Sequence, residues 1–356
     1  MQEEVSLPSQ QESGVRGQGS ARIPGPSPLT PGREVGILLI QLGTPEAPTA
    51  EALRPYLKQF LTDPRVIHDA GSLKWRLILN LFILRRRPAQ SAAKYRRIWD
   101  AQTGSPLLHW TRRQAELLQV SFPNASVRFG MQVGNPALAE VVREMVAAGA
   151  QRLIVLPMYP QYSATTTASA TDLLFKTLLD IPRVPALRVV PPYYEHPAYL
   201  DAVARVIGDD RKRLAWEPDH YVLSFHGIPI KYAQAGDPYA THVKRTTFAL
   251  VKRLGWRRPE WTQSFQSLFG RDRWLRPYTE EVLRGLPRHG KRRVFVAMPG
   301  FTADCLETLD EIGNEARETF MHAGGEALHA CPCLNDHPAW IEAMRTIIAE
   351  EGQGWL

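Results

Sequence analysis

The sequence has few cysteines and no long apolar run, and each absence excludes a class of protein. Three cysteines in 356 residues are too few for a fold held together by disulfides. Cys305, Cys331 and Cys333 are therefore expected to be reduced thiols of a cytosolic protein. No apolar run reaches the roughly 18 residues of a membrane-spanning helix. Without a second cysteine pair, the Cys-Pro-Cys motif cannot form a four-cysteine zinc or iron–sulfur site within this chain.

The common catalytic motifs are also missing. No GxGxxG follows the first predicted strand, and no Walker loop, HExxH or GxSxG motif occurs. The formal net charge of +7 favours an anionic partner. The basic clusters at 85–87, 257–258 and 291–293 are scattered and lack interleaved aromatic residues, so we expect no nucleic-acid partner.

The composition of the remaining chain predicts a globular body behind a disordered tail. Apolar residues make up 44% of the sequence, which is enough to build a core. Residues 1–33 are rich in Gly, Pro, Ser and Gln and are predicted to be disordered. They contain no apolar stretch of the kind found in signal peptides, and their glutamates argue against a mitochondrial presequence.

From residue 34 onward, short apolar runs alternate with segments of helical spacing. The predicted strands are 35–42, 126–133, 152–158, 186–192, 221–225, 261–267, 293–299 and 327–332. The predicted helices are 49–60, 105–120, 137–148, 165–179, 240–255, 278–286, 304–322 and 337–350. This alternation predicts an α/β fold of two doubly wound, Rossmann-like halves with parallel sheets. Ligands of such folds bind at the carboxyl ends of the strands.

The segment 73–88 contains a mostly apolar stretch followed by three arginines. It fits an ordinary buried helix, but it also fits an amphipathic lip that touches a greasy ligand or a membrane surface. It is too short to cross a bilayer.

Three groups of residues follow predicted strands and could carry chemistry. His226 comes directly after 221–225, and an imidazole there can accept a proton or bind a metal, or merely bond a loop carbonyl. The hydroxyl-rich segment 157–169 could hold a carboxylate at a helix start or simply cap the helix. The acidic residues of the third group share one helix face and could be functional or a solvated face; they are Asp304, Glu307, Glu311 and Glu315.

The order and spacing of nine segments resemble the ferrochelatase family, which inserts ferrous iron into porphyrins. The resemblance runs from about Val35 to about Ile347. The segments are LGTP (42–45), YRRI (95–98), GSPL (104–107), YPQYSATTTAS (159–169), SFHGIP (224–229), GDPY (236–239), FQS-x-FG (265–270), WLRPYT (274–279) and DCLETLDEI (304–312). The resemblance implies a porphyrin cleft between the two halves. It predicts a first domain of 34–186 joined by 329–356, and a second domain of 187–328 that carries the metal and proton site.

The resemblance also implies roles for individual residues. His226 and Glu307 would be the catalytic and metal-handling residues, with Glu311, Glu315 and Asp304 as an acidic relay. We expect His226 to be the principal proton acceptor, although it could instead be an iron ligand. Porphyrin contacts are expected at Leu42, Tyr95, Ser105, Tyr162, Ser163 and Trp274.

The implied substrates are ferrous iron and protoporphyrin IX, with two protons released. No tightly bound cofactor is expected, and no iron–sulfur cluster, because the cysteine-rich C-terminal extension of animal members is missing from this sequence. The expected location is the cytoplasm, with peripheral contact at the inner membrane face if 73–84 docks on lipid. Three positions depart from relatives: Cys305 replaces a histidine of animal members, Gln132 an arginine, and Leu268 a basic residue.

Two other interpretations remain open at this point. One is a chelatase for another tetrapyrrole, either coproporphyrin III or a cobalt or nickel branch. The other is a non-catalytic porphyrin- or haem-binding homologue, which the changes at Gln132 and Leu268 would allow.

Overall fold

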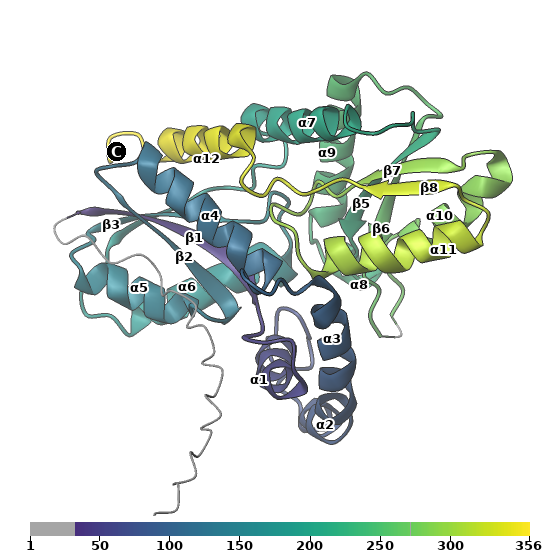
Figure 1. The fold of residues 1–356 in the computed structure, drawn as a ribbon. Helices are drawn as coiled ribbons and strands as arrows, with labels where there is room; N and C mark the ends of the chain where they lie inside the picture. Colours follow the sequence, from purple (N-terminus) through teal and green to yellow (C-terminus); the bar gives the residue numbers. More distant parts are fainter. Residues whose placement is uncertain (1–32, 271) are drawn as a thin grey trace, which may run out of the picture.

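Two four-stranded parallel sheets form the centre of the protein in the computed structural model, which describes residues 33–270 and 272–356 (Figure 1). The first sheet contains, in spatial order, β2 (Ser126–Gly134), β1 (Val35–Thr44), β3 (Arg152–Pro157) and β4 (Ala186–Val189). The second contains β6 (Trp261–Gln266), β5 (His220–His226), β7 (Arg293–Ala297) and β8 (Ala327–Ala330). The predicted disordered tail lies outside the described residues, apart from its last position.

The two sheets have the same strand order, with the second, first, third and fourth strand of each half side by side. All pairings are parallel, which confirms the predicted α/β class and the two doubly wound halves. In each sheet the order reverses beside the first strand, so ligands are expected at the ends of β1 and β3 and of β5 and β7.

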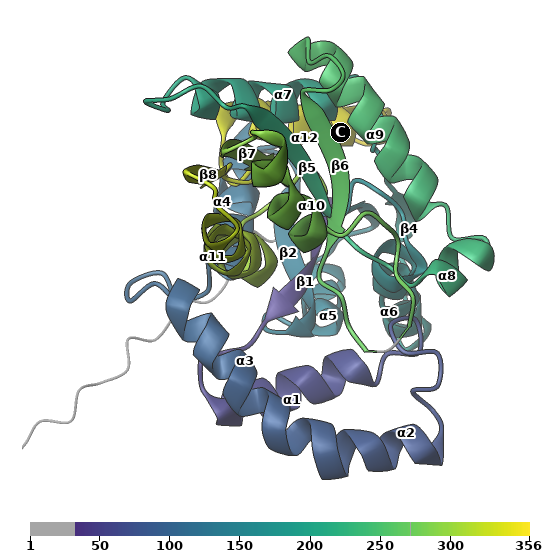
Figure 2. The same cartoon turned by 90° about the vertical axis from the view of Figure 1, so that its right-hand side faces the viewer.

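Helices connect and cover the strands (Figures 1 and 2). In the first half these are α4 (Pro106–Ser121), α5 (Leu138–Ala147), the π-helical turn η2 (Ala164–Ala168) and α6 (Ser169–Leu179). The remainder are α7 (Pro197–Arg211), α8 (Ile230–Gln234), α9 (Tyr239–Leu254), α10 (Thr279–Gly285), the 3-10 helix η3 (Leu286–His289), the π-helix η4 (Glu307–Ala316), α11 (Arg317–His322) and α12 (Pro338–Glu351).

An additional helical layer, which we call the lid, lies below the two sheets in Figures 1 and 2. It consists of α1 (Ala50–Leu61), α2 (Leu73–Ile78), the π-helical turn η1 (Leu79–Ile83) and α3 (Leu84–Ile98). Thr49 begins α1 as its N-cap and accepts a hydrogen bond from the backbone of Ala52. Leu53 of α1 packs against Ala92 and Tyr95 of α3, so the lid has a small core of its own.

The C-terminal helix α12 packs against α7 and α4 (Figure 1). The largest buried apolar cluster runs through both halves, from β1 to α12. Strand β4 belongs to the first sheet, so that sheet extends beyond residue 186 to Val189. The division into two domains stays a prediction. No helix among residues 33–270 and 272–356 is long and apolar enough to cross a membrane.

The helical content differs from the sequence prediction in three places. Helices α7 and α8 had not been predicted. The apolar stretch at 73–88 continues as one helical run through η1 and α3 to Ile98. The expected helix 304–322 begins near residue 307, and its first ten residues form the π-helix η4. A π-helix hydrogen-bonds from residue i to i+5, so positions four apart lie nearly in line along it.

Candidate active site

A cavity of about 780 Å³ lies between the lid and the carboxyl ends of both sheets. The first half contributes the end of β1 and the residues after β3, and the second contributes His226 at the end of β5 and Ser267 after β6. The start of η4 and the inner face of α3 complete the wall. The cavity therefore lies where the fold predicts a ligand site.

Gly43, in the LGTP segment at the end of β1, is part of the cavity wall. Its φ of +107° is a conformation that side-chain-bearing residues rarely adopt. A Cβ atom there would lie 1.8 Å from the carbonyl oxygen of Val133. Only glycine lets β1 approach β2 this closely at the edge of the cavity.

His226 is fixed in one tautomer by its own loop. Its Nδ1 atom lies 2.6 Å from the carbonyl oxygen of Gly227. Because a carbonyl can only accept, Nδ1 carries the proton, and in the neutral ring Nε2 is left as an acceptor. The Tyr239 hydroxyl donates to the backbone carbonyl of His226 at 2.8 Å and secures the strand end. The histidine therefore presents a proton-accepting nitrogen at the cavity.

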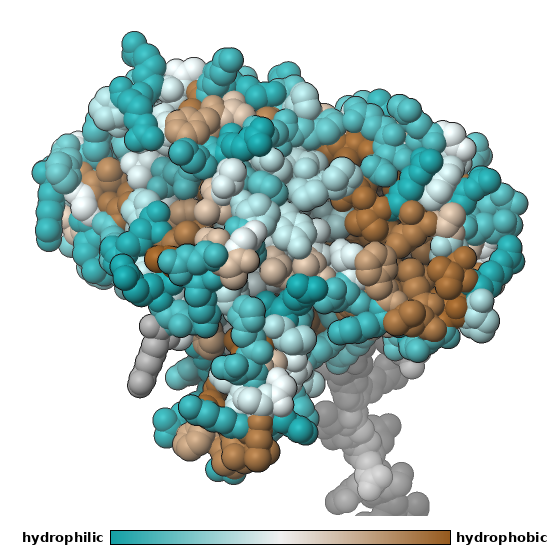
Figure 3. Space-filling view, turned by 180° about the vertical axis from the view of Figure 1, so that it is seen from behind, coloured by the Kyte–Doolittle hydropathy of each residue, from teal (hydrophilic) through white to brown (hydrophobic). Residues whose placement is uncertain are grey.

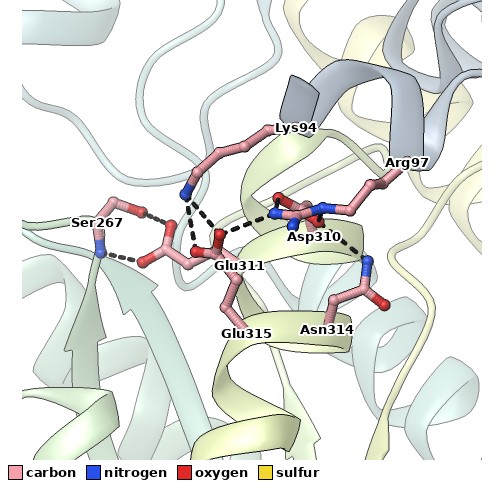
Figure 4. A network of polar contacts seen from close by, with 7 residues as sticks. All are labelled: Lys94, Arg97, Ser267, Asp310, Glu311, Asn314 and Glu315. Atoms are coloured by element: carbon pink, nitrogen blue, oxygen red, sulfur yellow. Dashed lines mark hydrogen bonds and ion pairs between the residues drawn. The ribbon is translucent and has the colours of Figure 1, made fainter. Parts of the chain in front are cut away.

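The acidic helix η4 is surrounded by hydrogen-bond donors (Figure 4). Arg97 of α3 holds Asp310 through two bonds of 2.6 Å. Glu315 is bound by Arg97 at 2.8 Å and by Lys94 at 2.7 Å. Glu311 accepts from both the backbone N–H and the hydroxyl of Ser267 at 2.6 Å.

Glu307 differs from these three residues. No nitrogen or oxygen donor in the described part of the chain hydrogen-bonds to its carboxylate. Its backbone carbonyl is anchored by Gln266 at 2.8 Å, and the Cys305 thiol lies beside it. Glu307 therefore brings a carboxylate with free lone pairs to the cavity, and ferrous iron binds such oxygen ligands.

Burial raises the pKa of Glu311, and repulsion from Glu307 acts in the same direction. The hydrogen bonds from Ser267 and the attraction of His226 offset this only in part. Ser267 has a φ of +64°, which is uncommon for a residue other than glycine. This conformation accompanies the double hydrogen bond to Glu311, and backbone strain of this kind concentrates at functional sites.

The structure brings His226, Glu307 and Glu311 to the same cavity. Two other members of the expected acidic relay lie elsewhere. Asp304 is buried away from the cavity, where its carboxylate accepts hydrogen bonds from the Asn335 amide and the Thr308 hydroxyl. Glu315 is not among the lining residues and is neutralised by Lys94 and Arg97. The helical spacing of these acids did not reveal their separate partners.

Four of the six expected porphyrin contacts line the cavity, namely Leu42, Tyr95, Ser105 and Trp274. Tyr162 and Ser163 are not lining residues. The Ser163 hydroxyl caps η2 and donates to Asp237 at 2.8 Å, and the backbone N–H of Tyr162 donates to His242. The capping interpretation therefore explains Ser163.

The three departures from relatives occupy different settings. Cys305 is buried in the cavity wall, and burial raises the pKa of its thiol. Leu268 lines the cavity but is half exposed. Gln132 is buried outside the lining, where it binds Ser169 and the Tyr159 hydroxyl.

Several lining residues were not predicted as site residues. Arg87 stands over the ring of Phe269 at 4.3 Å and has no carboxylate partner in the described part of the chain. Tyr56 and Asp310 also line the cavity, and burial raises the pKa of Tyr56, which keeps it a neutral phenol. The run of three arginines at 85–87 could have indicated Arg87 as a site residue. No feature of the sequence indicated that Asp310 pairs with Arg97. No group of three His, Cys, Asp or Glu side chains in 33–270 and 272–356 is arranged to hold a metal ion by itself.

Comparisons with known proteins agree with this geometry. A family model described as Ferrochelatase matches residues 34–352. A protein of Rhodopseudomonas palustris (strain TIE-1) named "Ferrochelatase" is 45% identical over 342 residues, covering 95% of this chain and 98% of the relative. A "Ferrochelatase" of Bradyrhizobium diazoefficiens is 44% identical and covers 91% and 95% of the two chains.

A solved structure supports the fold. The structure titled "SirB from Bacillus subtilis with Fe3+" superimposes with a TM-score of 0.51 at 17% identity, covering 70% of this chain and 92% of that one. At this identity the likeness concerns the arrangement of the two sheets and their helices.

Proposed function

The chain belongs to the ferrochelatase family, and we propose that protoporphyrin IX is the porphyrin into which it inserts ferrous iron. The observation that carries the proposal is the pairing, in one cavity, of an acceptor nitrogen on His226 with the unoccupied carboxylate of Glu307. A free-base porphyrin must lose two protons before it can hold a divalent metal. The same cavity therefore has to supply a base and a ligand for the ion.

The roles follow from the local chemistry of each residue. His226 accepts a ring proton at Nε2, because Nδ1 is committed to Gly227. Glu307 binds the arriving ferrous ion through its free oxygens and replaces part of the water shell. Glu311, whose pKa is raised by burial, is suited to take up a proton that His226 releases.

One edge of the porphyrin carries carboxylates, and Arg87 is placed to receive one. Partial burial lowers the pKa of Arg87, and no carboxylate in the described part of the chain offsets this. The other two cations of the described lining are already paired, Lys94 with Glu315 and Lys231 with Asp272. One free cation among the described lining residues suits the two propionates of protoporphyrin IX better than the four of coproporphyrin III.

The lid also supports peripheral contact with a membrane. Large apolar side chains are exposed along α2 and η1, and they belong to Leu73, Leu77, Leu81 and Phe82. Figure 3 shows apolar surface at the tip of the lid, at the bottom of that view. We place the enzyme in the cytoplasm with this tip against the inner membrane face. We also propose that it works without a resident cofactor or iron–sulfur cluster.

An anaerobic insertion assay tests the function. Ferrous iron and protoporphyrin IX are mixed with the native chain and with His226→Ala, and the loss of porphyrin fluorescence is followed. We expect turnover by the native chain and a decrease of about 100-fold or more in the variant, as for loss of a general base. Undiminished turnover in the variant would show that His226 is not the proton acceptor.

Two further outcomes separate the other interpretations. A native chain that binds protoporphyrin IX without metallating it would be a porphyrin carrier. A native chain that metallates coproporphyrin III faster, or that prefers cobalt or nickel over iron, would belong to another branch of tetrapyrrole metabolism.

A further inference from the structure

Four acidic side chains of η4 lie at or beside the cavity. Three of them are bound by other residues, as Figure 4 shows. Asp310 and Glu315 are held by cations of α3, and Glu311 is held by Ser267. Only Glu307 has no such donor among the described residues. The difference comes from the surroundings of η4, because the four side chains have the same chemistry.

Arg97 is the most constrained of these donors. Its planar guanidinium meets both oxygens of Asp310, a carboxylate whose side chain is 1% exposed. The hydrogen bond to Asp310 raises the pKa of Arg97, so the cation is always present. Asn314 adds a third donor to Asp310 at 3.0 Å. A buried carboxylate with three donor contacts is poorly available to a metal ion.

One nitrogen of Arg97 joins two carboxylates. Its Nη2 atom lies 2.6 Å from an oxygen of Asp310 and 2.8 Å from an oxygen of Glu315. The two acids are five residues apart, which is close to one turn of a π-helix, so they lie on the same side. Two carboxylate oxygens around one cation are also what a divalent ion would bridge. The guanidinium therefore occupies a position that would otherwise attract the metal.

Lys94 adds a second cation to the same group of side chains. Its Nζ atom contacts both oxygens of Glu315, at 2.7 and 2.8 Å, and the lysine itself lines the cavity. Both cations come from α3, which is part of the lid. The lid therefore brings two positive charges to two of the acids and none to Glu307.

We propose that Arg97 and Lys94 are positioning residues that withdraw Asp310 and Glu315 from metal binding and leave Glu307 to receive the ion. This inference rests on the proposed function, because it concerns the carboxylate that meets ferrous iron. Removing the two cations leaves Asp310 and Glu315 as a competing pair of ligands on the same helix as Glu307. The ion is then held where the porphyrin nitrogens do not reach it.

The test measures metal binding without porphyrin and without turnover. Mn²⁺, a divalent ion that prefers oxygen ligands, is titrated into the native chain and into Lys94→Gln/Arg97→Gln, and the free ion is followed by its electron paramagnetic resonance signal. We expect the double variant to bind Mn²⁺ at least tenfold more tightly. Its kcat for iron insertion should fall at least fivefold while the Kd for protoporphyrin IX changes less than threefold.

Two variants serve as controls. Adding Asp310→Asn and Glu315→Gln to the double variant removes the competing ligands, and the gain in Mn²⁺ affinity should disappear. Arg253→Gln breaks an ion pair with Asp201 outside the cavity and should leave both readouts unchanged. If Arg97 variants fail to fold, Lys94→Gln alone is measured, since its side chain is partly exposed; we expect a smaller gain in the same direction.

The outcomes are distinct from those of the proposed function. Unchanged Mn²⁺ affinity in a folded double variant would overturn the positioning role, and so would a loss of kcat matched by a loss of porphyrin binding. A native chain that does not metallate porphyrin would contradict the proposed function. The Mn²⁺ titration would still show whether the two cations keep metal ions away from Asp310 and Glu315.

Discussion

The exposed side chains at the apolar tip of the lid determine how strongly the proposed membrane contact should bind. Leu73, Leu77, Leu81 and Phe82 are 73%, 51%, 44% and 63% exposed. The three leucines are four residues apart and follow one side of α2 and η1. Exposed cations flank them at Lys74, Arg76, Arg85 and Arg86. The tip is therefore suited to an anionic lipid surface.

The magnitude comes from two contributions. The four partial exposures are equivalent to slightly more than two fully exposed side chains, and burying them in the lipid interface contributes about 4 kcal/mol. The four cations add about 1 kcal/mol each near an anionic surface. Leu77→Ser/Phe82→Ser removes about one full side chain of contact, or about 2 kcal/mol, which corresponds to about 30-fold weaker binding.

The assay is co-sedimentation with vesicles that contain phosphatidylserine. We expect Leu77→Ser/Phe82→Ser to bind about 30-fold more weakly at every salt concentration. Arg85→Gln/Arg86→Gln should show a loss of similar size only at low salt and only with anionic vesicles. Phe175→Ser/Leu179→Ser, two exposed apolar residues of α6, serves as the control and should bind normally. Equal losses in the α6 control and the lid variant would refute the argument, because binding would then reflect general stickiness.

Two more predictions concern charged groups in the cavity. Because burial raises the folded-state pKa of Glu311, the stability that its protonation provides is fully present below the usual glutamate pKa and is lost as the pH rises through the folded value. Glu311→Gln keeps an acceptor for Ser267 without a charge, so its Tm should exceed the native Tm more at pH 8 than at pH 4; a constant difference would contradict this. Arg87→Gln should raise the KM for protoporphyrin IX about tenfold, as for the loss of a charged hydrogen bond, with the KM for iron unchanged. The effect should vanish with the dimethyl ester of the porphyrin, and an equal effect on the ester would rule out carboxylate recognition.

The position of His226 could be predicted because it depends on a local pattern and a general rule. A buried strand ends at that residue, and the carboxyl ends of parallel strands meet at a common edge. The alternation of strands and helices predicted eight strands in two sheets, as observed. The helices α7 and α8 escaped prediction.

The arrangement of the acids could not be obtained in the same way. Spacings of three and four predict a shared face, and in the π-helix η4 Glu307, Glu311 and Glu315 still form one row, but the spacing does not show which of them meets a cation. Asp304 precedes that row and is held outside the cavity by Asn335 and Thr308. Ser163 is also engaged outside the cavity, because its hydroxyl caps η2 and donates a hydrogen bond to Asp237. Short polar side chains at a helix start serve the backbone first.

The deeper reason is that the partners of the acids come from remote parts of the chain. Arg97 and Asp310 are separated by 213 positions, and Lys94 and Glu315 by 221. A sequence pattern identifies a carboxylate but not whether a cation from the lid will occupy it. The docking of the lid on η4 supplies the cations that bind Asp310 and Glu315, while Ser267 binds Glu311. The availability of Glu307 is therefore a property of the assembled lid and helix.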